Sequence, residues 1–267
     1  AQNAPHEVVG QWLRPWYFPQ AGEDMAAAVS RECRAARQSV AMMDASTLGK
    51  IDVQGPDATE FLNRMYTHDV DQMSIGRCAY GLLLGEDGMV MDDGVMAHLG
   101  PEHYYLTTTT GGAATVLSWL ELWLQTEWPD LKVHLTSLTD QYSTIAVVGP
   151  KSRAVLANLD CSEDLSASAF PCMTVKPAML NGIRVQLFRV SFSGELAFEV
   201  NVDSRYAAGL WTAIYEAGGS FDITPYGTET MHVLRAEKGF VIVGQDTDGS
   251  VTPGDLKMGW MLSKSKD

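Results

Sequence analysis

Hydrophobic and polar residues follow two different periods along the chain, which predicts a mixture of helices and strands. Apolar residues recur at helical spacing in four stretches, residues 25–37, 113–127, 204–216 and 228–238. Gly239 follows the last stretch at the position that commonly ends a helix. Alternating or β-branched runs predict strands over residues 104–109, 183–187 and 198–202. Mixed order and hairpin-like spacing around Gly182 and Gly194 favour an α+β fold with antiparallel sheets.

One pattern occurs twice. Residues 51–57 and 145–151 each consist of a β-branched run, a Gly-Pro pair and the start of a helical pattern, about 94 residues apart. Proline suits the first turn of a helix, where its missing N–H costs nothing. The repetition predicts two related halves, residues 1–140 and 141–267, which can interleave. Gly-Pro is also a common turn, so coincidence is the alternative.

Composition excludes several classes of protein. The chain has 33 acidic and 19 basic residues, a net charge of −14, which opposes nucleic-acid binding. No apolar stretch approaches the roughly 20 residues that span a membrane. Four cysteines match no zinc or redox spacing, and no signal peptide is present, so we expect a reducing cytoplasm. A start without Met and an end without a turn signal indicate part of a longer protein.

Two carboxylates stand out at a predicted hairpin. An apolar strand, a glycine turn and a second apolar strand end on Asp92 and Asp93, within residues 80–94. Because neighbours on a strand point to opposite faces, at most one of the two faces a given pocket. The other is expected to face solvent or to cap a backbone N–H. An Asp-Asp pair before glycine is also typical of a simple turn.

A third carboxylate, Glu199, interrupts an apolar strand. If it points inward it needs a partner rich in N–H donors, because an unpaired buried charge is costly. The solvent face of an amphipathic strand is the alternative. Residues 107–112 are typical either of an anion-binding loop or of the end of a strand. The histidines show no metal-ligand spacing. Trp119 and Trp123 lie in an apolar stripe that predicts core or subunit contact.

Several long motifs in order resemble the glycine-cleavage T-protein (aminomethyltransferase) family over nearly the whole chain. These motifs occupy residues 16–19, 43–50, 92–93, 192–195 and 244–248. Finer features are more similar to the alpha subunits of heterotetrameric sarcosine oxidases, at residues 44–50, 107–112, 224–239 and 252–253. The resemblance implies a folate-binding aminomethyltransferase-like fold without its C-terminal barrel, and a tetrahydrofolate site shared between the two halves.

The resemblance also implies roles for individual residues. The acidic residue of the hairpin motif, the catalytic group, falls on Asp93. Positions that bind the folate fall on five residues, Tyr80, Thr109, Phe192, Glu199 and Phe240. Phenylalanine replaces the family's tyrosine at 192 and 240, and Met231 replaces an arginine of the T-proteins. These departures place recognition of a lipoyl arm in doubt and fit a one-carbon unit that comes from a flavin-generated imine.

The function implied by the resemblance is that of an enzyme part. It accepts the one-carbon unit of oxidised sarcosine and forms 5,10-methylene-tetrahydrofolate. Flavin and NAD are expected only in other parts of the full enzyme, so the isolated chain is not expected to oxidise sarcosine. Expected partners are the other oxidase subunits and reduced folate, with neither nucleic acid nor membrane. A non-catalytic folate-binding scaffold and a glycine-cleavage aminomethyltransferase are the alternatives.

Overall fold

The computed structural model describes residues 3–266 and divides the chain into two compact units. Unit 1 joins the chain up to Thr47 with Asp140–Val241, and unit 2 joins Leu48–Thr139 with the chain from Ile242 onward. The sequence predicted a boundary near residue 140 and allowed for interleaving, whereas the chain passes between the units three times. The reason is strand pairing, because β3 (Ala41–Asp44) pairs with β9 (Tyr142–Val148).

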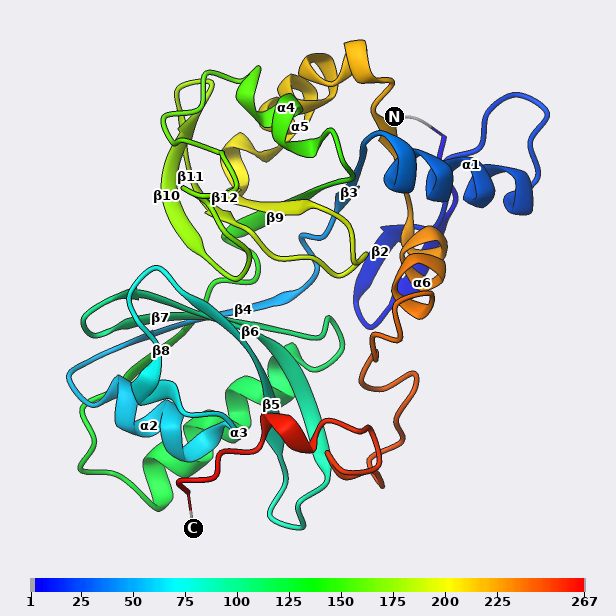
Figure 1. Ribbon diagram of the computed structural model, residues 1–267. Helices are drawn as coiled ribbons and strands as arrows, with labels where there is room; N and C mark the ends of the chain where they lie inside the picture. Colours follow the sequence, from blue (N-terminus) through cyan, green and yellow to red (C-terminus); the bar gives the residue numbers. More distant parts are fainter. Residues whose placement is uncertain (1–2, 267) are drawn as a thin grey trace. The chain divides into compact units, whose positions relative to one another are not determined.

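Unit 1 is built on a six-stranded sheet with the order β10-β11-β12-β9-β3-β13 (Figure 1). Its remaining strands are β10 (Val175–Leu180), β11 (Ile183–Phe188), β12 (Ala197–Asp203) and β13 (Thr224–Pro225). All neighbours are antiparallel except β13 and β3. A hairpin, β1 (His6–Val9) and β2 (Trp12–Pro15), precedes the sheet in the chain.

Helices cover both faces of this sheet. On one face, α4 (Ser152–Ala157) and α5 (Ser204–Ala217) bury Val155, Leu210 and Ile214 against strand residues such as Phe198. On the other face, α1 (Met25–Gln38) and α6 (Thr228–Ala236) pack a smaller cluster of alanine, methionine and valine side chains. The two faces therefore receive different residues from each strand, as the period of two requires.

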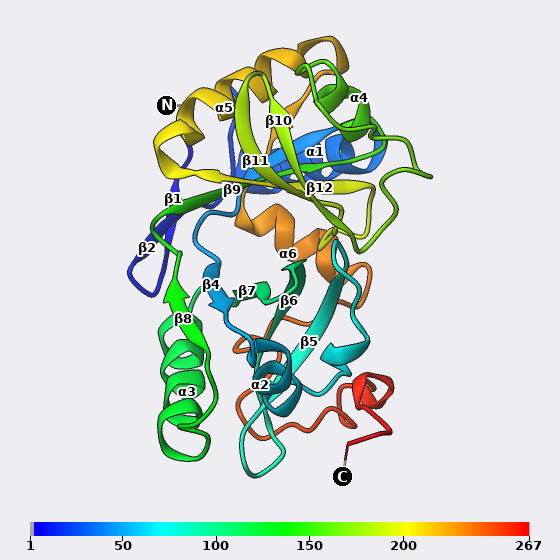
Figure 2. The same ribbon diagram turned by 90° about the vertical axis from the view of Figure 1, so that its left-hand side faces the viewer.

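Unit 2 contains a five-stranded antiparallel sheet with the order β5-β6-β7-β4-β8 (Figure 2). The strands are β4 (Gly49–Gln54), β5 (Cys78–Leu84), β6 (Val90–Gly100), β7 (His103–Thr108) and β8 (His134–Ser137). Two helices, α2 (Ala58–Met65) and α3 (Ala113–Thr126), enclose the main apolar cluster on one face. A returning segment, with Val243, Val251 and Met261, packs on Leu82 and Val90 of the same unit.

The two units share one order of elements, and that they are related halves stays a prediction. A strand, a Gly-Pro turn, a helix, three antiparallel strands and another helix follow one another from β4 to α3 and from β9 to α5. Both turn glycines are conformationally required, since Gly55 has φ +138° and Gly149 has φ +120°. A Cβ on Gly55 would lie 2.1 Å from the carbonyl oxygen of Lys132, and one on Gly149 would lie 2.5 Å from that of Ser39. At both Gly-Pro pairs, therefore, the glycine lies so close to another backbone segment that a side chain would not fit.

Three further features of the described residues bear on partners. None of the helices in residues 3–266 combines the length and the apolar character that a membrane span requires. None of the four cysteines, all of which lie within the described residues, forms a disulfide bond. No group of three or more His, Cys, Asp or Glu side chains in the described part of the chain could hold a metal ion.

Candidate functional site

The predicted site residues fall into two groups, one in each unit. In unit 2, Asp93 lies on β6 opposite Leu82 of β5, and Tyr80 lies two residues before Leu82 on the same face. This diagonal placement allows the Tyr80 hydroxyl to donate a short hydrogen bond to Asp93 Oδ2. The structure therefore brings together the predicted catalytic carboxylate and one of the predicted folate-binding residues.

The environment of Asp93 changes its acidity. Burial raises the pKa of Asp93 to about 6, although the hydrogen bond from Tyr80 opposes the rise. Burial and the neighbouring carboxylates also raise the pKa of the Tyr80 hydroxyl, so Tyr80 stays a hydrogen-bond donor. A carboxyl group whose pKa lies close to the working pH is suited to take up and release a proton.

Asp92 points to the opposite face of β6, as strand alternation predicts. It is 2% exposed and accepts hydrogen bonds from the backbone N–H of Asp93 at 2.8 Å and of Thr109 at 3.2 Å. The Thr109 hydroxyl donates to Asp92 Oδ2 at 3.2 Å and accepts from the N–H of Gly112 at 3.1 Å. Asp92 is thus the carboxylate that caps a turn, and Thr109 contacts Asp92, not Asp93. Burial raises the pKa of Asp92.

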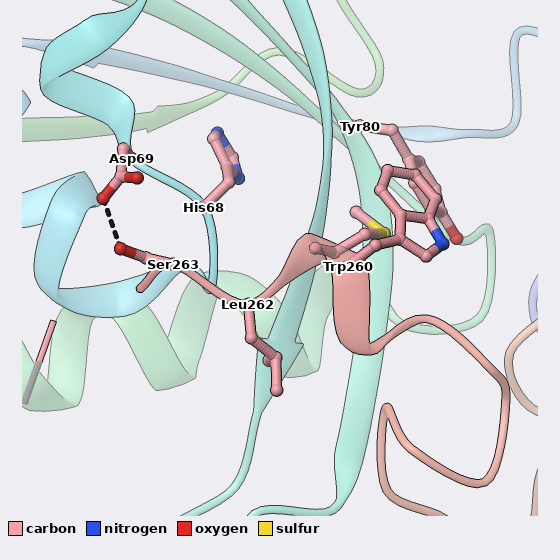
Figure 3. Close-up of a pocket in the computed structure, with 7 residues that line it drawn as sticks. His68, Asp69, Tyr80, Trp260, Leu262 and Ser263 are labelled. Carbon is pink, nitrogen blue, oxygen red and sulfur yellow. Dashed lines mark hydrogen bonds between the residues drawn. The ribbon is translucent and has the colours of Figure 1, made fainter. Parts of the chain in front are cut away.

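Tyr80 also lines a hollow of about 180 Å³ in unit 2 (Figure 3). The other lining residues are His68, Asp69, Trp260, Met261, Leu262 and Ser263. Ser263 donates to Asp69 at 2.5 Å, which fixes one wall. Neither ring nitrogen of His68 has a hydrogen-bond partner among the described residues, and burial lowers its pKa to about 4. His68 and Trp260 were not predicted as site residues, because neither lies in a patterned motif.

In unit 1, Glu199 occupies β12 on the same face as Ala197, the face on which α1 and α6 pack. The adjacent residues Phe198 and Val200 enter the large cluster on the other face. Glu199 is half-buried on this face. Its charge is close enough to Tyr226 to add to the effect of burial, which raises the pKa of that tyrosine.

The two predicted ring-contacting residues of unit 1 form a pair. The rings of Phe192 and Phe240 stack with centroids 6.2 Å apart and planes at 24°. Phe192 is 36% exposed and Phe240 39% exposed, so the pair is an accessible aromatic surface. Both residues stand where the family pattern has tyrosine, and the pair therefore offers ring faces without a hydroxyl.

Two arginines near this group escaped prediction. Arg14 of β2 is 8% exposed, and its Nη2 lies 3.9 Å from the sulfur of Met231, the position that carries arginine in T-proteins. Burial lowers the pKa of Arg14. Arg37, at the end of α1, bonds to the segments that carry Phe192 and Phe240. Neither arginine sits in a motif, so only the fold reveals what it contacts.

Comparison with known proteins agrees with the fold and the motifs. A family model described as the GCVT N-terminal domain matches residues 1–266. The chain belongs to this family. It is 57% identical to "Sarcosine oxidase subunit alpha" of Corynebacterium sp. strain P-1 over all of its own length, but it spans only 28% of that protein. The resemblance to sarcosine oxidase alpha subunits and to the aminomethyltransferase family is confirmed.

Two solved structures show a similar fold. The glycine cleavage aminomethyltransferase T of Bartonella henselae superposes with a TM-score of 0.85 at 24% identity, over 98% of this chain and 66% of its own. A chain of the heterotetrameric sarcosine oxidase of Corynebacterium sp. U-96, solved with pyrrole 2-carboxylate, gives a TM-score of 0.53 at 17% identity, over 76% of this chain and 97% of its own. The predicted α+β aminomethyltransferase-like fold is thereby confirmed.

Proposed function

We propose that this chain forms the reduced-folate site of a sarcosine oxidase alpha subunit. There the one-carbon unit of oxidised sarcosine passes to tetrahydrofolate and gives 5,10-methylene-tetrahydrofolate. The observation that carries the proposal is the partly buried Asp93 carboxyl, held by the Tyr80 hydroxyl and with its pKa raised to about 6. The high identity to sarcosine oxidase alpha subunits supports the choice of enzyme.

The side chains present fit a folate. A pterin has a planar ring and an edge with N–H donors, which a carboxylate such as the half-buried Glu199 can accept in two hydrogen bonds. The exposed rings of Phe192 and Phe240 offer faces on which a planar ring can stack. Tyr80 supplies a hydroxyl beside Asp93. Thr109 is proposed as a folate contact on one ground, its position in the turn that Asp92 caps.

Tetrahydrofolate supplies the nucleophilic amine nitrogens that accept the one-carbon unit. Asp93 takes up a proton from an attacking nitrogen and can return it to the leaving group, which is the amine of glycine when the donor is the imine and water when the donor is formaldehyde. Tyr80 keeps the carboxylate in one orientation, so that proton transfer does not wait for a rotamer change. Asp92 acts indirectly, since its carboxylate holds the backbone N–H of Asp93 and the turn at Thr109.

The identity to sarcosine oxidase alpha subunits also supports a division of the reaction between parts of the full enzyme. Oxidation of sarcosine, with flavin and NAD, is placed in parts of the enzyme outside residues 1–267, and the other subunits are the proposed partners. Cytoplasmic location is proposed because the four cysteines form no disulfide bond in the described part of the chain. A folate-binding scaffold without chemistry is the second candidate, since the site geometry suits binding as well as catalysis.

The deciding experiment uses the complete, assembled oxidase with Asp93→Asn. Asparagine keeps the size and can accept from Tyr80 but cannot act as a base. We expect methylene-tetrahydrofolate formation to fall by roughly 10²–10⁴-fold. Sarcosine consumption should continue, with formaldehyde released in place of the folate product, and reduced folate should still bind.

Asp92→Asn is the matched variant, because Asp92 lies next in the chain on the opposite face. It should change stability more than product partition. Equal and mild effects of both substitutions would favour the scaffold. Loss of folate coupling in Asp92→Asn alone would show that the roles of the two carboxylates are reversed.

A further inference from the structure

The guanidinium of Arg37 is the centre of a dense set of hydrogen bonds in unit 1. Its Nη1 donates to the Ser193 carbonyl oxygen at 2.6 Å and to Glu195 Oε1 at 2.9 Å. Its Nη2 donates to the Leu234 carbonyl oxygen at 2.9 Å and to Glu237 Oε2 at 2.7 Å. Nε makes a fifth bond to Glu237 at 3.2 Å. Every donor nitrogen of the side chain is therefore in use.

These acceptors belong to two separate segments, and each segment carries one ring of the aromatic pair. Ser193 directly follows Phe192, in the irregular stretch between β11 and β12. Leu234 and Glu237 lie at the end of α6, and Phe240 follows three residues after Glu237. A planar guanidinium is pre-organised, so it can fix both segments with little loss of side-chain freedom.

A second contact keeps the same two segments close together. Gly194 has φ +76°, and a Cβ built on it would lie 2.4 Å from Cγ of Lys238. The ammonium of Lys238 lies 3.9 Å from Glu195, which Arg37 also binds. Gly194, two residues after Phe192, thus packs against the side chain of Lys238, two residues before Phe240.

Arg37 is not needed to hold α1 and α6 together. Glu32, on the same helix, already binds the start of α6 through the Gly227 N–H at 3.0 Å and the Thr230 hydroxyl at 2.6 Å. The Arg37 side chain is 21% exposed and that of Glu237 is 55% exposed, and ion pairs this close to solvent add little stability. The contacts of Arg37 point instead to the two segments that bear the rings.

We infer that Arg37 is a positioning residue, which holds Phe192 and Phe240 as one surface for the planar ring of a reduced folate. The inference rests on the proposed folate function. The hydrogen bonds of Arg37 go to backbone carbonyl and carboxylate oxygens of the two segments, so it acts on the rings through the backbone. Without it, each ring would still be present, but the pair would no longer be fixed as a unit.

The test compares Arg37→Gln with Arg31→Gln in the complete, assembled enzyme. Arg31 is a matched control, because it lies on the same helix, is 23% exposed and bonds to Glu23 and to the Phe18 carbonyl oxygen. The probe is 5-formyl-tetrahydrofolate, a stable reduced folate. Arg37→Gln should weaken its binding roughly 3- to 30-fold, the range of a lost aromatic contact or coupled pair. Arg31→Gln should change it less than about twofold, and Arg37→Lys should restore part of the affinity.

A double-mutant cycle separates positioning from general stability. If Arg37 acts through the rings, Arg37→Gln should cost little further affinity in a Phe192→Ala background, whereas independent effects would add. Additive losses, or equal losses for Arg37→Gln and Arg31→Gln, would overturn the inference while wild-type binding upholds the proposed function.

A measurement without folate tests the positioning role of Arg37 independently of the proposed folate function. Fluorine NMR of 4-fluorophenylalanine at positions 192 and 240 reports whether the rings share one environment. Arg37→Gln should broaden or shift both signals, and Arg31→Gln should leave them unchanged. Unchanged signals in Arg37→Gln would contradict the positioning role, whereas failure of the wild type to bind 5-formyl-tetrahydrofolate would contradict the proposed function. If Arg37→Gln does not fold, Glu237→Ala removes two of the five bonds and serves in its place.

Discussion

The Tyr80 hydroxyl donates to the carboxylate of Asp93, a residue thirteen positions later on the neighbouring strand. The register of β5 and β6 makes the two side chains diagonal neighbours on one face. The same register sends Asp92 to the other face, where backbone N–H groups surround it. Two adjacent carboxylates therefore have different surroundings, and each can be tested separately.

Loss of the tyrosine hydroxyl should change the pH dependence of folate coupling. The hydrogen bond from Tyr80 lowers the pKa of Asp93, so Tyr80→Phe should raise that pKa above its value of about 6. A base must be deprotonated to act, so the rise in methylene-tetrahydrofolate formation with pH should move up by about one unit. Tyr104→Phe is the control, since its hydroxyl bonds to Thr59 instead. An unshifted profile in Tyr80→Phe would mean that Asp93 does not set the pH dependence.

Asp93→Asn should stabilise the fold at neutral pH. In the unfolded chain an aspartyl pKa is near 3.8, whereas in the fold it is about 6. Between these values the folded state holds a proton that the unfolded state has lost, so stability falls as pH rises through this window. The full penalty, about 2–3 kcal/mol, is present above pH 6 and absent below pH 4. Thermal unfolding should therefore show a gain for Asp93→Asn at pH 7.5 and none at pH 3.5; a gain independent of pH would refute this cause.

The turn before α3 should not tolerate a side chain at Gly112. A Cβ there would lie 2.1 Å from Asp92 Oδ2 and 2.6 Å from the Thr109 hydroxyl, whereas a Cβ on Gly111 would meet nothing within 4 Å. Gly112→Ala should cost about 1–3 kcal/mol, because neither neighbour can move without losing hydrogen bonds. Gly111→Ala should stay within about 0.5 kcal/mol. Urea unfolding measures the stability of both variants, and equal stabilities would contradict the close packing of Gly112 against Asp92.

Glu32 should be essential to the stability of unit 1. It is completely buried and accepts from the N–H of Phe18, the N–H of Gly227 and the hydroxyl of Thr230. Glutamine offers one oxygen and would turn an amide donor toward another donor, so Glu32→Gln should cost about 1–3 kcal/mol. Glu23→Gln, which alters a surface carboxylate bound to Arg31, should cost much less. Calorimetric unfolding that ranks the two variants the other way would contradict the prediction.

Glu199→Gln should weaken binding of reduced folate. A carboxylate that accepts two hydrogen bonds from a pterin edge loses one acceptor on this change, which costs about 1–3 kcal/mol. Glu216→Gln, on the exposed side of α5, is the matched control. Titration calorimetry with 5-formyl-tetrahydrofolate measures both. Unchanged affinity in Glu199→Gln would remove Glu199 from the site.

Local sequence signals located most of the elements. The helices predicted over 25–37, 113–127 and 204–216 are found as Met25–Gln38, Ala113–Thr126 and Ser204–Ala217. They were predictable because each buries an apolar face at helical spacing. The helix over 228–238 ends earlier, at Ala236, with Gly239 at φ +73° in the turn that follows. Strand alternation likewise separated Asp92 from Asp93.

Features that depend on distant pairing were not visible in the sequence. The pairing of β3 with β9 joins residues that no local pattern connects, and it decides which unit holds the start of the chain. The β1–β2 hairpin was missed because its side chains Val8 and Leu13 are 74% and 68% exposed, so no buried alternation marks it. Arg37 is an ordinary helical arginine in sequence, and only the fold brings its acceptors together.

Synthesis on the ribosome delivers β3 long before the strand that completes its pairing. Roughly 100 residues separate β3 from β9, so at about 5–20 residues per second the wait is on the order of 5–20 s. During this time Ala41, Met42 and Met43, all buried in the fold, have no sheet to join. The strands of unit 2 from β4 to β8 emerge meanwhile as one continuous stretch. The nascent chain therefore depends on protection of the apolar strand β3, and chaperone demand should fall mainly on unit 1.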